Sequence, residues 1–306
     1  MNNPLLKIYN LSKNYGTKRA LDTINIKIEK GTIYGLIGQN GAGKTTLIRI
    51  LNKIIEGDEG EVLFKNKLIT AKDVQYIGYL PEERGLYKNM SIEEQAMYFG
   101  QLKGMTKSQA KIQLKYWLQR FEILDWKHKK IQDLSKGMAQ KVQFIITVLH
   151  QPDLLILDEP FSGFDPINAQ VIAHEIKNLS KQGTTILFSS HRMESVTEMC
   201  NAICLLHNGK VLLDGSIDAI QQKYAQEIYE VSIQNFKEDK LVELMANPNY
   251  KTTIIFKNET ILKMEIFKNN KEDKLLNELL NIGKLILYKQ HVPNLQEIFI
   301  KTIQDA

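Results

Sequence analysis

The sequence contains few cysteines and no long apolar run. Its 306 residues include two cysteines, Cys200 and Cys204, whereas a secreted disulfide scaffold would carry many more. We therefore expect buried thiols in a reducing compartment, because no further ligand cluster accompanies their i, i+4 spacing. No apolar run approaches the roughly 18 residues that span a bilayer. If the protein works at a membrane, another chain must cross it.

Signals for targeting and for nucleic-acid binding are also weak. The N-terminal stretch MNNPLLKIYN has neither a basic n-region nor an apolar h-region, so we expect no signal peptide. The net charge of +5 is mild for this length, and the densest basic block is KHKK at 127–130. Such a charge suits an anionic ligand or a membrane surface without selecting one, and we expect no nucleic-acid partner.

Alternating strand and helix signals predict an α/β fold with a parallel sheet. Between about 88 and 150 the pattern becomes helical, and two capping boxes mark helix starts at Ser91 and Thr106. The Asn-Gly pair in HNGK at 207–210 predicts a type I′ hairpin turn. The expected strands are 5–9, 23–28, 33–37, 61–64, 75–80, 154–158, 184–190 and 202–206, and the expected helices are 44–52, 91–103, 107–121, 135–149, 166–181 and 191–200.

A second pattern begins after about residue 218. Strand and helix signals follow there in the order βαββαβ, which is the ferredoxin-like arrangement. We therefore predict a domain at 1–218, with a helical subdomain at about 88–150, and a small α+β accessory domain at 219–306. The segments of the second pattern are strands at 227–233, 251–256, 260–267 and 284–290, and helices at 237–246, 270–280 and 294–303.

The stretch GQNGAGKT fits the pattern G-x-x-x-x-G-K-[ST] from Gly38 to Thr45. Glycines let backbone N–H groups approach a phosphate, and the following helix adds its positive N-terminal end. Lys44 would reach the β- and γ-phosphates, and the hydroxyl of Thr45 would bind Mg²⁺. A plain turn would not need this lysine and threonine at a helix start. The predicted nucleotide-binding residues of this stretch are Gly38, Gln39, Asn40, Gly41, Ala42, Gly43, Lys44, Thr45 and Thr46.

A second motif, LLILDEP at 154–160, reads as a buried strand that ends in two acids. Asp158 would hold Mg²⁺, directly or through water, and Glu159 could polarise an attacking water. An acidic turn after a core strand is the structural alternative. The presence of the glycine-rich stretch GQNGAGKT in the same chain makes that alternative much weaker.

A third motif, LSKGMAQ at 134–140, is by itself only a serine-capped helix start. Together with GQNGAGKT, LDEP, SGFD at 162–165 and His191 after TILFSS, it resembles the ABC ATPase family, in which such motifs come in this order. Tyr15 in LSKNYG matches the aromatic residue on which that family stacks adenine. The resemblance covers about residues 4–215. It implies a P-loop NTPase fold with an antiparallel β subdomain and a helical subdomain.

The resemblance also implies a mechanism in which two copies close head to tail as a homodimer. The signature motif of one copy, Ser135, Lys136, Gly137 and Met138, would then meet the ATP held by the other. His191 would hydrogen-bond the γ-phosphate, although a role in capping the next helix is an alternative. Asp165 would connect the two subunits. Positioning and charge stabilisation of this kind are what phosphoryl transfer requires.

Two departures from the family pattern affect these expectations. Glu82 stands where the family has a glutamine that contacts Mg²⁺ and senses the transmembrane partner. A carboxylate can still bind the cation or its water, so metal contact is expected to survive. Lys136 and Met138 replace a glycine and a glutamine of the signature. We hypothesise that Lys136 adds positive charge near the partner's ATP and tightens closure.

Finer features resemble the ATPase subunits of bacterial sodium and drug exporters, whose permease is a separate chain. GYLPEERGLY at 78–87 and the NLQEIF-like terminal helix carry this resemblance. It implies a cytoplasmic subunit, peripheral on the inner face of the membrane, that docks the permease through a loop containing Glu82, Arg84 and Tyr87. Leu86 and Tyr87 would line the groove in which the permease docks, unless both are ordinary core residues.

Two other classes of function remain as alternatives. A soluble ABC ATPase could act on ribosomes or nucleic acid, but the single ATPase unit and the short helical insert argue against it. A binding module that uses ATP only as a clamp would have no need of a base such as Glu159.

Overall fold

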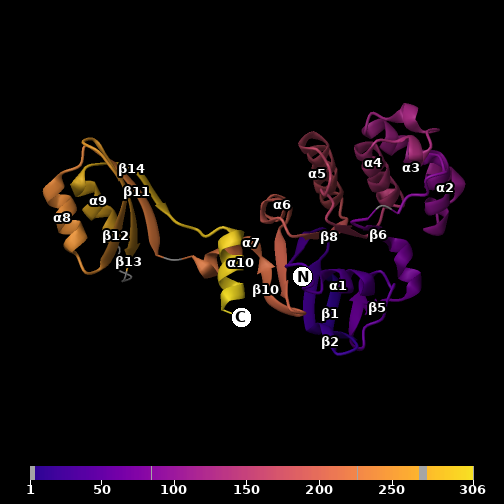
Figure 1. Ribbon diagram of the computed structural model, residues 1–306, viewed down its shortest axis with the longest axis horizontal. Coiled ribbons are helices and arrows are strands. Elements are labelled where there is room, and N and C mark those ends of the chain that lie inside the picture. Colours follow the sequence, from indigo (N-terminus) through magenta and orange to yellow (C-terminus); the bar gives the residue numbers. More distant parts are fainter. Residues whose placement is uncertain (1–3, 84, 226, 269–273, 306) are drawn as a thin grey trace. The chain divides into compact units, whose positions relative to one another are not determined.

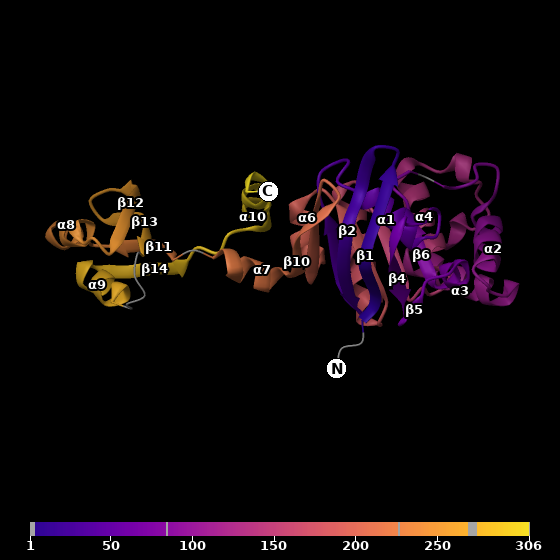
Figure 2. The same cartoon turned by 90° about the horizontal axis from the view of Figure 1, so that it is seen from below.

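The computed structural model describes residues 4–83, 85–225, 227–268 and 274–305. It divides into two units, one reaching Ile217 together with the segment from Thr302, and the other comprising Asp218–Lys301. Figures 1 and 2 show the elements of each unit. In the part of the chain described, no helix combines the length and the apolar character needed to cross a membrane.

The first unit is built on a six-stranded sheet in the order β10-β9-β3-β8-β7-β6. Its strands from β9 to β6 pair in parallel, and β10 is antiparallel to β9. The apolar runs IYGLI and LLILD are buried along their whole length, as expected for central strands covered on both faces. The strands are β3 (Ile33–Ile37), β6 (Ile77–Leu80), β7 (Leu154–Asp158), β8 (Thr185–Ser190), β9 (Ala202–His207) and β10 (Lys210–Ser216).

A four-stranded antiparallel sheet in the order β2-β1-β4-β5 forms a second layer of this unit. Ile24, Ile26 and Ile28 alternate with more exposed residues along β2 and pack in one apolar cluster with Leu47 and Leu51 of α1. The predicted strands are therefore confirmed, although β1 and β2 are longer than expected. The elements are β1 (Pro4–Tyr15), β2 (Lys18–Glu29), α1 (Lys44–Leu51), β4 (Glu59–Phe64) and β5 (Lys67–Leu68), followed by a 3-10 turn at Ala71–Tyr76.

Three helices, α2 (Ile92–Leu102), α3 (Lys107–Arg120) and α4 (Lys136–Val148), gather in the predicted helical segment (Figure 1). Both predicted capping boxes are present, because Ser91 and Glu94 bond each other reciprocally, as do Thr106 and Gln109. Two short 3-10 turns, Leu124–Trp126 and Ile131–Asp133, link α3 to α4. The caps fix the helix starts close to the predicted positions.

Two more helices of the first unit are α5 (Pro166–Lys181) and α6 (Met193–Met199). Helix α6 begins two residues later than predicted, and Arg192, not His191, stands at its N-cap position. The capping alternative for His191 is therefore wrong. The predicted hairpin turn between β9 and β10 is confirmed, because Asn208 and Gly209 have φ angles of 48° and 76°.

The second unit contains a four-stranded antiparallel sheet in the order β12-β13-β11-β14. Helices α8 and α9 bury leucines against Val231, Ile233 and Met264 of the sheet (Figures 1 and 2). The start of the helix predicted at 270–280 lies outside the described residues. The elements are α7 (Ile217–Tyr224), β11 (Ile228–Gln234), α8 (Glu238–Ala246), β12 (Tyr250–Lys257), β13 (Ile261–Lys268), α9 (Leu275–Ile282), β14 (Lys284–Gln290) and α10 (Leu295–Gln304).

Candidate nucleotide site

The loop between β3 and α1 is held in a conformation that requires glycine. Gly38 and Gly43 have φ angles of 154° and 111°. A Cβ atom on Gly38 would collide with the carbonyl oxygen of Leu206, and one on Gly43 would lie 2.6 Å from the carbonyl oxygen of Ala20. Both positions therefore exclude a side chain. Without side chains there, the backbone amides of the loop can approach a ligand closely.

The β9–β10 hairpin supports this loop from outside. The Gly209 N–H donates to the carbonyl of Ala42 at 3.0 Å, and the Gly209 carbonyl accepts from the Asp22 N–H at 2.7 Å. The turn thus links the loop to β2. A rigid loop pre-organises its amides for an anion without further ordering cost.

Lys44 is the first residue of α1 and is 8% exposed. Its Nζ donates to the carbonyls of Gly38 at 2.6 Å and Gln39 at 3.1 Å, so the ammonium lies against the loop. Helix α1 has no side-chain cap and no acidic residue in its first turn. Its free N-terminal amides and Lys44 together favour a phosphate.

Three carboxylates lie within electrostatic reach of Lys44. Burial lowers the pKa of Lys44, and the negative charges of Glu159, Asp158 and Glu82 oppose that shift. Asp158 is 7% exposed at the end of β7. Burial raises its pKa, and the charges of Glu82 and Glu159 raise it further. The fold therefore brings the predicted metal-binding and catalytic acids to the lysine of the loop.

Glu159 and His191 form the closest polar pair of the site. One oxygen of Glu159, Oε1, accepts from the backbone N–H of His191 at 2.8 Å and lies 2.5 Å from its Nδ1. The other oxygen accepts from the hydroxyl of Ser190 at 3.2 Å. The His191 side chain is 58% exposed and that of Glu159 11%. Sequence reasoning missed Ser190, although it lies at the end of a predicted strand beside His191.

The residues present fit a hard divalent cation. Three carboxylates act electrostatically on a single ammonium, which leaves excess negative charge, and oxygen atoms are the ligands that Mg²⁺ prefers. Thr45 adds an exposed hydroxyl at the start of α1. Among the described residues, no three histidine, cysteine or acidic side chains are grouped closely enough to hold a metal themselves. Phosphate and water oxygens would have to complete such a site.

The signature residues and Asp165 lie on a different surface. Ser135 caps α4 by accepting from the Met138 N–H at 3.3 Å, and Asp165 caps α5 by accepting from the Asn168 N–H at 3.0 Å. In the described chain, no hydrogen bond or ion pair joins Ser135 or Lys136 to the loop at 38–45. The structure therefore keeps these two groups of predicted residues apart within one copy.

Lys136 lies over the loop that precedes α5. Its Cε and Nζ are 2.7 Å from the place where a Cβ on Gly163 would stand. Nearby, the Gln140 amide donates to the carbonyl of Ser162 at 2.6 Å. The start of α4 and the SGFD segment thus form one surface, a relation that the sequence alone did not indicate.

A cavity of about 270 Å³ adjoins the glycine-rich loop. Its walls add basic groups from Lys18 and Arg19, which sequence reasoning missed although they closely follow Tyr15. Tyr15 itself is 47% exposed at the end of β1, so its ring is available for stacking. The residues lining the cavity are Lys18, Arg19, Gln39, Asn40, Gly41, Ala42, His207 and Asn208.

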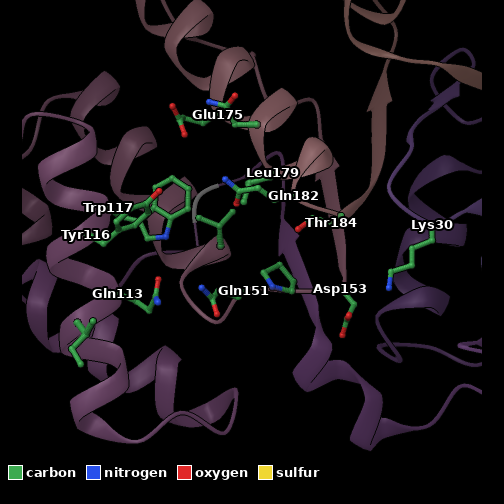
Figure 3. Close-up of a pocket in the computed structure, with 15 residues that line it drawn as sticks. Lys30, Gln113, Tyr116, Trp117, Gln151, Asp153, Glu175, Leu179, Gln182 and Thr184 are labelled. Carbon is green, nitrogen blue, oxygen red and sulfur yellow. The ribbon is translucent and has the colours of Figure 1, made fainter.

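A larger cavity of about 500 Å³ lies elsewhere in the first unit (Figure 3). Tyr116 and Trp117 of α3 form one side, and Leu179 of α5 lies on another. None of the residues that line it belongs to the glycine-rich loop or to the acidic end of β7. The larger cavity is therefore not the one beside the predicted phosphate-binding and metal-binding residues.

Comparisons with known proteins agree with this geometry. The ABC transporter family matches residues 21–162. The uncharacterized ABC transporter ATP-binding protein YhaQ of Bacillus subtilis is 38% identical over 98% of this chain and 98% of its own length. The linearmycin resistance ATP-binding protein LnrL of the same species is 30% identical over 98% of this chain and all of its own.

Solved structures give the same result. The structure of an ATP-binding subunit of an ABC transporter aligns with a TM-score of 0.68 and 28% identity. The alignment covers 72% of this chain and 93% of that one. The match to the ABC transporter family, over residues 21–162, includes the glycine-rich loop, the acidic end of β7 and the helical segment.

Proposed function

The chain belongs to the family of ABC transporter ATP-binding subunits, which hydrolyse ATP, and we propose that it powers an exporter whose permease is a separate chain. The observation that carries the site assignment is that Lys44 lies against the glycine-rich loop within electrostatic reach of Glu159, Asp158 and Glu82. Phosphoryl transfer to water needs this combination of phosphate cradle, cation site and base.

We assign the roles within one copy as follows. The loop from Gly38 to Thr46 holds the phosphates, with Lys44 on the β- and γ-phosphates and Tyr15 against adenine. Thr45, Asp158 and Glu82 would hold Mg²⁺, which when bound neutralises charge on the phosphate oxygens. Glu159 orients and deprotonates the attacking water.

His191 would act beside Glu159. The Glu159 carboxylate accepts its Nδ1–H, which orients the ring. In the imidazolium form, Nε2 can then donate to the γ-phosphate while Nδ1 stays on Glu159.

The signature residues, Ser135 to Met138, would serve the ATP of a second copy. Their separation from the loop at 38–45 within one copy supports this proposal, as do the free amides at the start of α4. Asp165 would lie at the junction between the copies. Lys136, which carries no ion pair among the described residues, would add a cation to that junction.

Shared sites predict that hydrolysis depends on protein concentration. The specific ATPase activity of the purified chain should rise with concentration until the dimer is saturated. Lys136→Ala should shift that rise to higher concentration, and the shift should shrink with added salt because it is electrostatic. A phosphate-release titration at two salt concentrations measures both. Constant specific activity at all concentrations would contradict the shared site, and an unshifted variant would contradict the role of Lys136.

The name of one relative supports outward transport. The full-length relative LnrL is named for resistance to linearmycin, and a resistance function is consistent with outward transport. The comparisons name transporter subunits, so nothing favours the ribosomal alternative. On this proposal the subunit is cytoplasmic and attaches to the inner face of the membrane through its permease.

We propose residues 1–218 as the ATPase domain, with the helical subdomain at about 88–150, and 219–306 as a ferredoxin-like accessory domain. The order β11-α8-β12-β13-α9-β14 and the antiparallel sheet order β12-β13-β11-β14 support the ferredoxin-like assignment. The boundary lies within α7.

The loop before α2 would dock the permease. Tyr87 is 51% exposed. Its ring stacks on that of Phe99, with 5.9 Å between the ring centroids, and meets the ring of Tyr98 edge-on at 5.8 Å. The side chain of Gln95 holds the backbone of Tyr87: it accepts from the Tyr87 N–H and donates to the Tyr87 carbonyl, both at 3.1 Å. Leu86 is partly buried, so neither residue is an ordinary core residue. Arg84, also expected in this loop, lies outside the described residues.

Tyr87→Ala should weaken permease binding about tenfold or more, because exposed aromatic residues commonly dominate interfaces. Co-purification from membranes and permease-stimulated ATPase activity measure the effect. Tyr76→Ala, at another exposed tyrosine of the same unit, provides the matched control. Equal permease recovery for Tyr87→Ala and wild type would contradict the docking assignment.

A further inference from the structure

A cavity of about 330 Å³ adjoins the docking loop and combines a mostly apolar wall with basic residues. Apolar side chains supply most of its wall, including Ile54, Leu86, Phe99 and Ile146. Two basic residues, Lys103 and His150, also line it. No aspartate or glutamate stands among the described residues of the lining.

Lys103 is a partly buried cation without a counter-ion among the residues that the structure describes. Its Nζ donates to the carbonyls of Val74 at 2.7 Å and Ile77 at 2.8 Å. Burial lowers the pKa of Lys103 to about 8. Within the described chain, Lys103 forms no ion pair with a carboxylate. An ammonium has three donors, so one N–H is left for a partner.

His150 does not supply a second charge to the cavity. Burial, together with the nearby charge of Lys103, lowers its pKa to about 4. At neutral pH the ring is therefore uncharged, and its Nε2 is buried without a hydrogen-bond partner. The described part of the lining thus presents one cation among neutral, largely apolar groups.

Covering the cavity removes more water from Lys103. A purely apolar occupant would leave the ammonium desolvated and unpaired, which is strongly unfavourable. A backbone carbonyl would accept the remaining N–H but would not balance the charge. A carboxylate does both, because charge-assisted hydrogen bonds to an ammonium are short and strong.

We propose that this cavity receives a segment of the permease that places an Asp or Glu side chain on Lys103 and apolar side chains against Leu86 and Phe99. This inference rests on the proposed role as a transporter subunit and adds the chemistry of the partner. Lys103 then selects among membrane partners, since a segment without an acid leaves a buried charge unpaired.

Variants of Lys103 test the charge. Lys103→Met should weaken binding of the detergent-solubilised permease, taken from the neighbouring reading frame, at least about thirtyfold in biolayer interferometry. Lys103→Arg keeps the charge and donors and should bind much more tightly than Lys103→Met. The matched control is Lys111→Met, at an exposed lysine of α3, which should bind like wild type. Thermal unfolding followed by circular dichroism identifies any variant that fails to fold.

A crosslink locates the acid independently of those variants. Benzoylphenylalanine placed at Leu86 should crosslink to one permease segment, which mass spectrometry identifies. We expect an Asp or Glu in that segment, and its change to Lys should restore binding to Lys103→Glu. A crosslinked segment without an acid, or wild-type affinity of Lys103→Met, would overturn the inference. If wild-type protein itself fails to bind the permease, the proposed function fails instead.

Discussion

Glu159→Gln should reduce the rate of ATP hydrolysis by about two to four orders of magnitude while leaving ATP binding intact. Glutamine has the same shape but cannot take a proton from water, and general-base catalysis contributes about this much. The substitution also removes one of the three negative charges that act on Lys44. Affinity for ATP should therefore stay equal to wild type or increase.

Two measurements separate catalysis from binding in this variant. Phosphate release under single-turnover conditions reports the rate, and a fluorescent ATP analogue reports affinity. ATP should also hold Glu159→Gln as a dimer in light scattering, because the closed state persists when hydrolysis is blocked. Glu194→Gln, at an exposed acid in the first turn of α6, is the matched control and should hydrolyse ATP normally. A wild-type rate for Glu159→Gln would show that another group is the base.

The elements that local pattern specifies were predictable. IYGLI and LLILD are short apolar runs bounded by glycine or acid, and both form strands at the predicted positions. Capping boxes located the helix starts near Ser91 and Thr106. In contrast, β5 and α7 were not predicted, and for β10 only the hairpin turn before it was. Strand β5 has only two residues, and KVLLDGS in β10 does not alternate regularly between buried and exposed positions.

Contacts between distant segments were not predictable from local pattern. The bond between Glu159 and His191 joins residues 32 positions apart, and it requires β7 and β8 to lie side by side in the sheet. The position of Lys136 over Gly163 requires α4 to meet the start of α5. Lys103, which has no counter-ion among the described residues, meets the carbonyls of Val74 and Ile77 only because the C-terminal end of α2 lies beside them. Motifs identify the chemistry, but packing decides which groups meet.

Lys44→Ala should reduce ATPase activity to the background level, because the ammonium would stabilise charge on the γ-phosphate during transfer. It should also weaken ATP binding at least about tenfold, since a hydrogen bond to a charged group is worth roughly 1.5–3 kcal/mol. The substitution removes the ammonium that lies against the loop and leaves the carbonyls of Gly38 and Gln39 without that donor. Ser135→Arg should also be inactive, because it replaces the α4 cap with a cation at a positive helix end.

Mixing these two inactive variants tests whether the site is shared. In a mixed dimer, one site combines the intact loop of the Ser135→Arg chain with the intact signature of the Lys44→Ala chain, and the other site carries both defects. Random pairing of two equivalent subunits makes half of the dimers mixed, so activity should recover to roughly a quarter of wild type. Phosphate release from the mixture, compared with each variant alone, measures the recovery. If each copy completed its own site, no mixture would exceed its components, because every chain would still carry one lesion in its single site.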